Sequence, residues 1–254
     1  MGKVTAIANQ KGGVGKTTTA VNLSAALGEA GKKVMLVDID PQGNATSGLG
    51  VNKRTVQKSS YDLLSAGMPA NEIILHTRYQ NVDLIPSNIS LAGAEIELVD
   101  AADREEKLKR ALVPVREDYD FILIDCPPSL GIITLNALVA ADTLLVPAQC
   151  EFYALEGLSQ LMATVRTVKR LYNPSIDIEG VLLTMYDGRL NLTLQVVEEV
   201  KRFFPRKVYK TVVPRNVRIS EAPSFGQPVI YYDKYSKGSD AYRELAQEII
   251  GQNR

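Results

Sequence analysis

The residues with the clearest chemistry lie in the segment NQKGGVGKTT, at positions 9–18, which follows a short apolar run and precedes a helical pattern. Glycines there let backbone N–H groups approach phosphate oxygens, and the start of a helix adds partial positive charge. In this register Lys16 is expected to reach the β- and γ-phosphates of ATP, and the Thr17 hydroxyl to ligate Mg²⁺. A tight turn without ligand would explain the glycines but not the Gly-Lys-Thr order. The sequence therefore predicts that Mg-ATP is bound by Lys11, Gly12, Gly13, Val14, Gly15, Lys16, Thr17 and Thr18.

Carboxylates follow two further apolar runs. The run VMLVD ends in Asp38, with Asp40 two residues later, and the run FILID ends in Asp125, the Walker B position. If these runs are parallel strands, their carboxyl ends meet at the edge where open α/β sheets bind their ligands. Asp125 is expected to hold Mg²⁺ through a water molecule. The predicted metal site comprises Thr17, Asp40 and Asp125.

The elements that must position these residues alternate along the chain. Short β-branched runs alternate with helical periodicity, which is typical of a parallel sheet covered by helices. Most of the runs are apolar throughout, as in strands buried on both faces. The expected strands are residues 4–8, 33–38, 82–86, 121–125, 143–147, 178–184 and 208–213. The expected helices are residues 16–30, 104–116, 155–172, 192–204 and 237–250, the last with Tyr242, Leu245, Ala246, Ile249 and Ile250 on its inner face.

The fold class that follows is α/β: a P-loop NTPase with a mostly parallel, twisted sheet and helices on both faces. At 254 residues with 45% hydrophobic content, one domain spanning residues 1–254 is expected. No apolar stretch reaches the roughly 20 residues that cross a bilayer, and we expect a cytoplasmic protein. Cys126 and Cys150 lack metal-ligand spacing and are interpreted as core residues, and His76 as an ordinary surface or helix residue.

Charge is balanced overall but unevenly distributed. The 29 basic and 29 acidic residues cancel. Residues 186–218, however, contain eight basic and three acidic side chains, and residues 83–106 contain seven acidic side chains and one arginine. The molecule is therefore expected to have one acidic and one basic region, and the basic segment is a candidate for contacts with DNA phosphates.

One detail of the phosphate loop departs from the usual GxxxxGK[ST] pattern, because Gln10 replaces the first glycine and Lys11 precedes the Gly-Gly pair. In this the chain resembles the deviant-Walker ATPases, and over nearly its whole length it is similar to the ParA/Soj-type chromosome-partitioning ATPases. The motifs that carry the resemblance are QKGGVGKTTT, VDIDPQGNATSGLG, IDCPPSLG, PAQCEFYALEGL and VPRNVRISEAPSFGQP.

The resemblance implies roles for particular residues. Lys11 would cross a dimer interface to the partner subunit's nucleotide, in the manner of an arginine finger supplied in trans. With Lys16 and Asp40 it forms the predicted catalytic set. Asp40 would position the attacking water, and Asp38 would support the metal site. Residues 128–131 would be the switch that senses the γ-phosphate.

Later motifs imply contacts with adenine and DNA. Met185, Pro214 and Asn216 are expected near the adenine base. Arg189 and Arg218 are the first candidates for DNA contacts, followed by Lys201, Arg202, Arg206 and Lys207.

The resemblance further implies an ATP-dependent homodimer that binds double-stranded DNA without sequence preference and is associated with the nucleoid. A ParB/Spo0J-type centromere-binding protein would stimulate its hydrolysis, and a replication initiator would be a further partner. The first strand is expected at about Lys3, which leaves no room for an N-terminal helix-turn-helix domain.

Three alternatives stay open on the sequence alone. The first is a MinD-like ATPase that acts on membranes. A membrane-targeting helix would have a basic polar face and Trp or Phe on its apolar face, and the last helix has neither. The second is a reductase similar to nitrogenase iron protein, against which there are only two cysteines. The third is a nucleotide-gated regulator of transcription or replication initiation in which slow hydrolysis acts as a timer.

Overall fold

The computed structural model describes residues 2–151 and 154–253, so Phe152 and Tyr153 of the motif PAQCEFYALEGL lie outside the described residues. Its strands are β1 (Lys3–Ile7), β2 (Val34–Asp38), β3 (Leu75–His76), β4 (Val82–Ile85), β5 (Phe121–Asp125), β6 (Thr143–Gln149), β7 (Asp177–Tyr186) and β8 (Val208–Pro214). Its α-helices are α1 (Lys16–Glu29), α2 (Asn44–Gly48), α3 (Ser60–Leu64), α4 (Leu91–Glu97), α5 (Lys107–Leu112), α6 (Ile132–Ala140), α7 (Ala154–Leu171), α8 (Asn191–Phe203), α9 (Val217–Glu221), α10 (Val229–Tyr232) and α11 (Lys237–Gln252). Three 3₁₀ turns complete the list: η1 (Ala70–Glu72), η2 (Val113–Asp118) and η3 (Ala222–Phe225).

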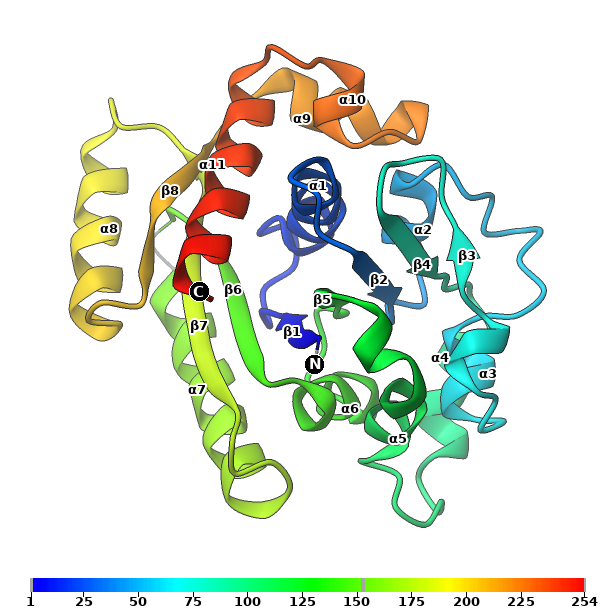
Figure 1. Cartoon of the computed structure of the whole chain (residues 1–254). Helices are drawn as coiled ribbons and strands as arrows, with labels where there is room; N and C mark the ends of the chain where they lie inside the picture. The colour runs from blue at the N-terminus through cyan, green and yellow to red at the C-terminus, as the bar shows by residue number, and fades with distance from the viewer. Residues whose placement is uncertain (1, 152–153, 254) are drawn as a thin grey trace.

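The strands form one sheet in the order β3-β4-β2-β5-β1-β6-β7-β8. All neighbouring strands pair in parallel except β3, which is antiparallel to β4 at one edge. Helices lie on both faces of this sheet, as Figure 1 shows. The predicted α/β architecture with a mostly parallel sheet is therefore confirmed.

Alternation along the strands divides the core into two layers. In β5, for example, Leu123 belongs to the layer beneath α1 and α11, whereas Ile122 and Ile124 belong to the opposite layer. The opposite layer contains the buried faces of α3 to α8. Tyr242, Leu245, Ala246 and Ile249 of α11 are buried against the sheet, as the periodicity of the last helix predicts, and Ile250 packs at the edge of the same layer.

The observed elements differ from the expected ones in several places. The helix expected over residues 104–116 is shorter, because Asp103 adopts a positive φ and Pro114 has no N–H to donate, so α5 ends at Leu112 and a 3₁₀ turn follows. The antiparallel β3 and the helices α2, α3, α4, α6, α9 and α10 were not predicted. Most of these are too short for a periodic pattern to emerge.

Several interpretations of single residues are confirmed. Cys126 and Cys150 are free and buried. His76 lies on the surface, in β3, with its Nδ1 atom 2.8 Å from Asp83 Oδ1. Within the described part of the chain, no helix combines the length and the apolar character needed to cross a membrane.

The sheet places three motifs beside one another. In the register of the parallel pairs, the last residue of β5, Asp125, lies next to Ile7 of β1 and next to Asp38 of β2. The phosphate loop after β1 and the carboxylates after β2 and β5 therefore meet at the carboxyl edge of the sheet.

Candidate nucleotide-binding site

The loop between β1 and α1 is shaped by glycines and anchored by a neighbouring strand. Gly13 and Gly15 have φ angles of 75° and 91°, a region that side chains with a Cβ atom rarely adopt. A Cβ atom on Gly12 or Gly13 would meet nothing within 4 Å, so this side of the loop is open. Val14 is buried, and its carbonyl accepts a 2.8 Å hydrogen bond from the Thr184 hydroxyl of β7. The loop is thus a fixed, open cradle at the start of α1.

Lys16 spans this cradle. Its ammonium donates to the Lys11 carbonyl at 3.1 Å, and the residue is almost completely buried. Burial lowers the pKa of Lys16, and the negative charges of Asp125 and Asp40 act in the opposite direction. An ammonium group with one carbonyl partner in a buried setting is well placed to gain a phosphate oxygen as a further partner.

The carboxylate of Asp125 has no hydrogen-bond partner among the described residues. It is completely buried, and neither of its oxygens accepts a hydrogen bond of normal geometry from any described residue. Burial raises its pKa well above the usual range, as do Asp38 and Asp40, whereas the nearby Thr17 hydroxyl and Lys16 lower it. A buried carboxylate beside a threonine hydroxyl and two more carboxylates fits the oxygen ligands that Mg²⁺ prefers. The residues present therefore suit the predicted metal.

Asp40 and Asp38 have different surroundings. Asp40 is buried and accepts one hydrogen bond among the described residues, from Gln42 N at 2.9 Å. Asp38 is fully buried, and its oxygens accept from Asp40 N, Thr46 N and Thr46 Oγ1 at 3.1, 2.8 and 2.7 Å. Burial raises the pKa of Asp38 to about 6, against the effect of these hydrogen bonds. Asp38 thus holds the start of α2, and Asp40 keeps capacity for another partner.

Thr46 connects this network to β4. Its hydroxyl donates to Asp38 and also accepts a 2.9 Å hydrogen bond from Ser87 N. Replacing Thr46 by valine keeps the shape of the side chain but removes the hydroxyl, so Asp38 and the Ser87 N–H each lose a hydrogen bond. Since an unsatisfied buried polar group costs on the order of 1–3 kcal/mol, we expect Thr46→Val to lower the free energy of unfolding by about 2 kcal/mol in urea titrations without nucleotide.

Two controls accompany the Thr46→Val measurement. Thr46→Ser, which keeps the hydroxyl, and Thr164→Val, at a surface position of α7, are each expected to stay within about 1 kcal/mol of the wild type. A Thr46→Val protein as stable as the wild type would contradict the role assigned to the hydroxyl.

Lys11 lies on the outer side of the loop. Its ammonium forms an ion pair with Glu151 Oε2 at 2.8 Å, and the two side chains are 31% and 46% exposed. Glu151 is held in turn by the Gln149 amide. The Asn9 side chain accepts from Lys11 N at 3.0 Å and donates to the Pro147 carbonyl at 2.7 Å, which fixes the backbone beneath. A surface pair of this kind contributes at most about 1 kcal/mol, so the Lys11 side chain can exchange partners easily.

The residues predicted to contact adenine surround one cavity. A hollow of about 540 Å³ beside the phosphate loop is lined by Gly15, Thr18, Met185, Pro214, Asn216 and Tyr242, among others. Met185 has a φ of 51°, an uncommon conformation for a residue with a side chain, and such conformations concentrate at ligand sites. The Asn216 side-chain oxygen accepts from Arg218 N at 2.9 Å and Ile219 N at 3.4 Å, so it caps α9.

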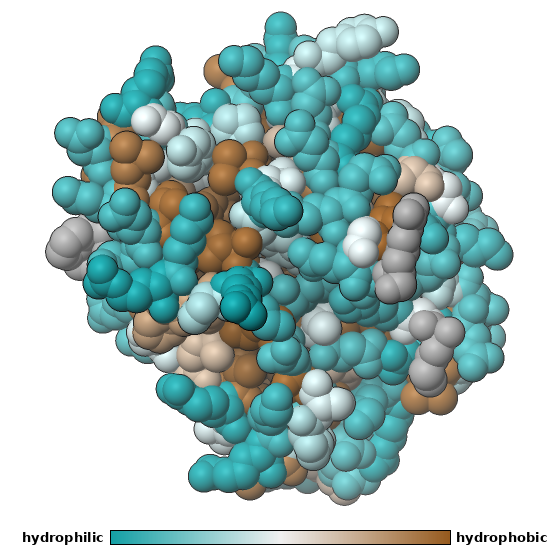
Figure 2. Space-filling model, turned by 60° about the vertical axis from the view of Figure 1, so that its left-hand side comes forward, coloured by the Kyte–Doolittle hydropathy of each residue, from teal (hydrophilic) through white to brown (hydrophobic). Residues whose placement is uncertain are grey.

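The predicted DNA-binding residues lie in α8, in the loops that join α8 to β7 and β8, and, for Arg218, in α9; α8 and its two loops lie at the β8 end of the sheet (Figure 1). Several of them are paired with carboxylates of the same chain: Arg189 with Asp187, Arg218 with Glu221 and Asp233, Arg202 with Glu199, and Lys207 with Asp177. Lys201 and Arg206 are exposed. Figure 2, turned toward this side, shows hydrophobic side chains among the hydrophilic ones. Arg189 follows the carboxyl end of β7, whereas Arg206 and Lys207 precede the amino end of the parallel strand β8, so these candidates lie at opposite edges of this part of the sheet. Their contact with DNA stays a prediction.

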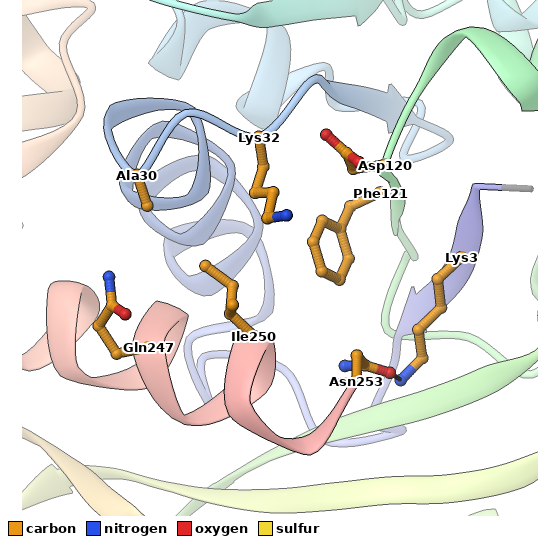
Figure 3. A pocket seen from close by; sticks show the side chains of 8 residues that line it. All are labelled: Lys3, Ala30, Lys32, Asp120, Phe121, Gln247, Ile250 and Asn253. Carbon is orange, nitrogen blue, oxygen red and sulfur yellow. Dashed lines mark hydrogen bonds between the residues drawn. The ribbon is translucent and has the colours of Figure 1, made fainter.

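A second hollow lies far from this site. Its volume is about 550 Å³, and it is lined by residues at the amino-terminal ends of β1 and β5 and by α11, including Lys3, Lys32 and Asn253 (Figure 3). The Lys3 ammonium donates to Glu179 and Asn253 at 2.7 Å each. None of the residues predicted to bind nucleotide lines this hollow, and we assign no ligand to it.

Five residues at the site were missed by sequence reasoning: Asn9, Thr46, Ser87, Glu151 and Thr184. Asn9 and Thr184 are polar residues at the ends of apolar strands, which is a usable signal. Glu151 had none, because its contact with Lys11 joins residues 140 positions apart.

Comparisons with known proteins agree with this geometry. Residues 2–178 match the family model described as an AAA domain. The sporulation initiation inhibitor protein Soj of Bacillus subtilis is 60% identical over 249 residues, with 98% of each chain covered. The chromosome partitioning protein ParA of Myxococcus xanthus is 51% identical, with 98% of this chain and 88% of that protein covered. A crystal structure described as cobyrinic acid a,c-diamide synthase from Mycobacterium smegmatis with bound ADP and magnesium superimposes with a TM-score of 0.87 at 38% identity, covering 100% of this chain and 97% of that one.

Proposed function

The chain belongs to the ParA/Soj family of chromosome-partitioning ATPases, and from that membership we propose that it is a switch in which Mg-ATP drives dimerisation and the ATP-bound dimer binds DNA without sequence preference. Hydrolysis of ATP returns it to a monomer with low DNA affinity. A ParB/Spo0J-type centromere-binding protein accelerates that step. In the cell the dimer is associated with the nucleoid, and a replication initiator is a further partner.

The observation that carries this proposal is that the two lysines of one loop are placed differently. Lys16 is buried inside the cradle, whereas the Lys11 ammonium lies on the outer side and pairs, in the part of the chain that the structure describes, with the half-exposed carboxylate of Glu151. A lysine that served its own subunit's phosphates would not need to be on the outer side. Lys11 is therefore available to a second subunit's nucleotide once Glu151 releases it.

The chemistry follows from the residues at the carboxyl edge of the sheet. When bound, Mg²⁺ would neutralise charge on the phosphates, and Thr17 and Asp125 are the residues that would hold it. The loop N–H groups and Lys16 bind and orient the phosphates. Asp40 accepts a hydrogen bond from the attacking water and aligns it with the γ-phosphate. Asp38 and Thr46 keep the Asp40 loop in place through their hydrogen bonds.

The proposal is tested by measuring DNA affinity in each nucleotide state. A fluorescently labelled double-stranded DNA of random sequence is titrated with the protein in the presence of ATP, ADP or no nucleotide, and its anisotropy is recorded. Tight binding is expected only with ATP and should weaken steeply as salt is raised, because phosphate contacts release counterions. Equal DNA affinity in the three states would overturn the switch.

Arg189→Ala should separate DNA binding from dimerisation. The Arg189 side chain is 89% exposed, and its guanidinium donates two hydrogen bonds to Asp187. These bonds, with a third from the Arg189 backbone N–H, lower the pKa of that carboxyl group to about 2. Removing the guanidinium deletes one phosphate contact and leaves the Asp187 charge uncompensated near the DNA. We expect the ATP-dependent dimer to form normally and its DNA affinity to fall at least about tenfold at 100 mM salt.

Arg110→Ala is the matched control for this measurement. Arg110 is also an exposed arginine paired with carboxylates, Asp103 and Glu106, but it lies outside the basic segment. Its replacement is expected to leave DNA affinity unchanged. Wild-type DNA retention by Arg189→Ala at this salt concentration would remove Arg189 from the DNA interface.

A further inference from the structure

The outer side of α4 carries an apolar stripe that the fold does not use. Ile89, Ala92, Ile96 and Val99 are spaced three and four residues apart, so they follow one side of the helix and the turns that flank it. Ile89 is 70% exposed, Ile96 79% and Val99 55%. The opposite side, with Leu91, Ala94 and Leu98, is buried in the core and accounts for the docking of the helix. Contiguous exposed apolar side chains of this kind mark interaction surfaces.

Acidic residues flank the stripe. Glu95 lies on one side of it and Asp100 on the other, both exposed, and Glu97 accepts a 3.0 Å hydrogen bond from Tyr61. In the acidic segment of residues 83–106, Glu105 pairs with Arg104, and Asp103 and Glu106 pair with Arg110, so Glu95, Glu97 and Asp100 are the carboxylates that border the stripe. The stripe therefore lies in a negative field and complements a positively charged partner.

The same helix touches the segment that leads away from the nucleotide. A Cβ atom placed on Gly131 would lie 2.7 Å from Glu95 Oε1, so the α4 side chain lies directly against the start of α6. Residues 126–131 join Asp125 to α6, and the Ser129 carbonyl in that stretch accepts from Thr134 Oγ1 at 2.7 Å. Through Glu95, α4 is therefore in contact with the stretch that follows Asp125.

We propose that the outer face of α4, with Ile96 at its centre and Glu95 and Asp100 at its margins, is the docking surface for a lysine- or arginine-rich amphipathic helix of the protein that stimulates hydrolysis. The partner helix presents apolar residues at matching intervals to the stripe and its cations to the carboxylates. This inference rests on the proposed function, because it locates where the stimulating partner acts. Docking there shifts residues 126–131 and so acts on the Asp125 side of the site.

A second copy of this chain fits the surface poorly. Its own basic segment is at the other end of the sheet from α4 (Figure 1). Arg189, Arg202, Arg218 and Lys207 of that segment already pair with carboxylates of their own chain. A contact between opposite ends would also be head-to-tail and would generate open chains rather than a closed dimer. A basic helix from a different protein satisfies both the charge and the apolar spacing.

The test uses the full chain and the ParB-type protein of the same organism. Ile96→Asp is compared with Val113→Asp, which adds the same charge at a similarly exposed apolar position of η2. Direct binding is measured by biolayer interferometry, and ATP hydrolysis is measured with and without the partner. We expect Ile96→Asp to weaken partner binding at least about tenfold and to lose stimulation correspondingly, while Val113→Asp behaves as wild type.

A charge-reversal variant, together with measurements made without the partner, distinguishes failure of the docking surface from failure of the proposed function. Asp100→Lys should weaken partner binding severalfold at low salt and flatten its salt dependence. Both variants should keep wild-type basal hydrolysis, ATP-dependent dimerisation and DNA binding. Undiminished stimulation of Ile96→Asp would overturn the inference, and so would loss of its ATP-dependent dimer, which would identify the stripe as a contact between copies. If the wild type itself bound DNA regardless of nucleotide, the proposed function would fail while the binding measurement still decided the surface.

Discussion

Asp40→Ala is expected to bind ATP with nearly wild-type affinity, to hydrolyse it at least about 100-fold more slowly, and to accumulate as a DNA-bound dimer. The magnitude is that of losing a group that positions the attacking water. The carboxylate accepts a hydrogen bond from Gln42 N and, among the described residues, none from the loop that binds the phosphates. The phosphate cradle therefore survives the substitution, and only the step after binding is slowed.

The measurements for Asp40→Ala are ATP binding by a fluorescent analogue, phosphate release, and DNA retention at moderate salt. Asp118→Ala, at an exposed aspartate beside the amino-terminal end of β5, is the control and should match the wild type in all three. Turnover by Asp40→Ala at the wild-type rate would show that another group positions the water. Loss of ATP binding would instead place Asp40 in the binding site itself.

Lys11→Ala is expected to bind ATP but to remain monomeric. The backbone of residue 11 serves the loop through its N–H and carbonyl groups, which alanine retains, so the cradle is expected to stay intact. What the variant loses is the ammonium that reaches a second subunit's nucleotide. Since a cation supplied in trans accelerates phosphoryl transfer by about 10³–10⁵, we expect hydrolysis to fall at least about 100-fold. ATP-dependent dimerisation and DNA binding should disappear.

Sedimentation velocity in the presence of ATP measures the monomer–dimer equilibrium. Lys11→Ala is combined with Asp40→Ala for this measurement, so that ATP is not consumed during the run. Lys32→Ala, at the hollow on the opposite edge of the sheet, is the matched lysine control. Glu151→Gln removes the ion pair that holds Lys11 in the single chain, and since such a pair is weak it should favour dimerisation at most about fivefold. A Lys11→Ala dimer of normal affinity would refute the role in trans. A Glu151→Gln protein that cannot dimerise would place Glu151 in the interface.

Local chemistry explains why much of the fold and the phosphate loop could be predicted. The loop is a run of consecutive residues, so its glycines, Lys16 and Thr17 need only a strand before and a helix after to be recognised. The strands β1, β2, β4, β5, β6, β7 and β8 are apolar runs long enough to be seen directly. The short helices α2 and α4 have five and seven residues, and their formation depends on what they pack against, so periodicity missed them.

By itself, then, the sequence determined the phosphate loop, the carboxylates that follow β2 and β5, the parallel sheet and the family. Each of these is encoded by neighbouring residues. Only the tertiary structure decided that Lys11 is tied to Glu151, that Asp38 is occupied by Thr46 while Asp125 has no hydrogen-bond partner among the described residues, and that α4 turns Ile96 outward beside Gly131. These features depend on which strands lie side by side and on which face of a helix is buried, and distant segments settle both only when the chain has packed.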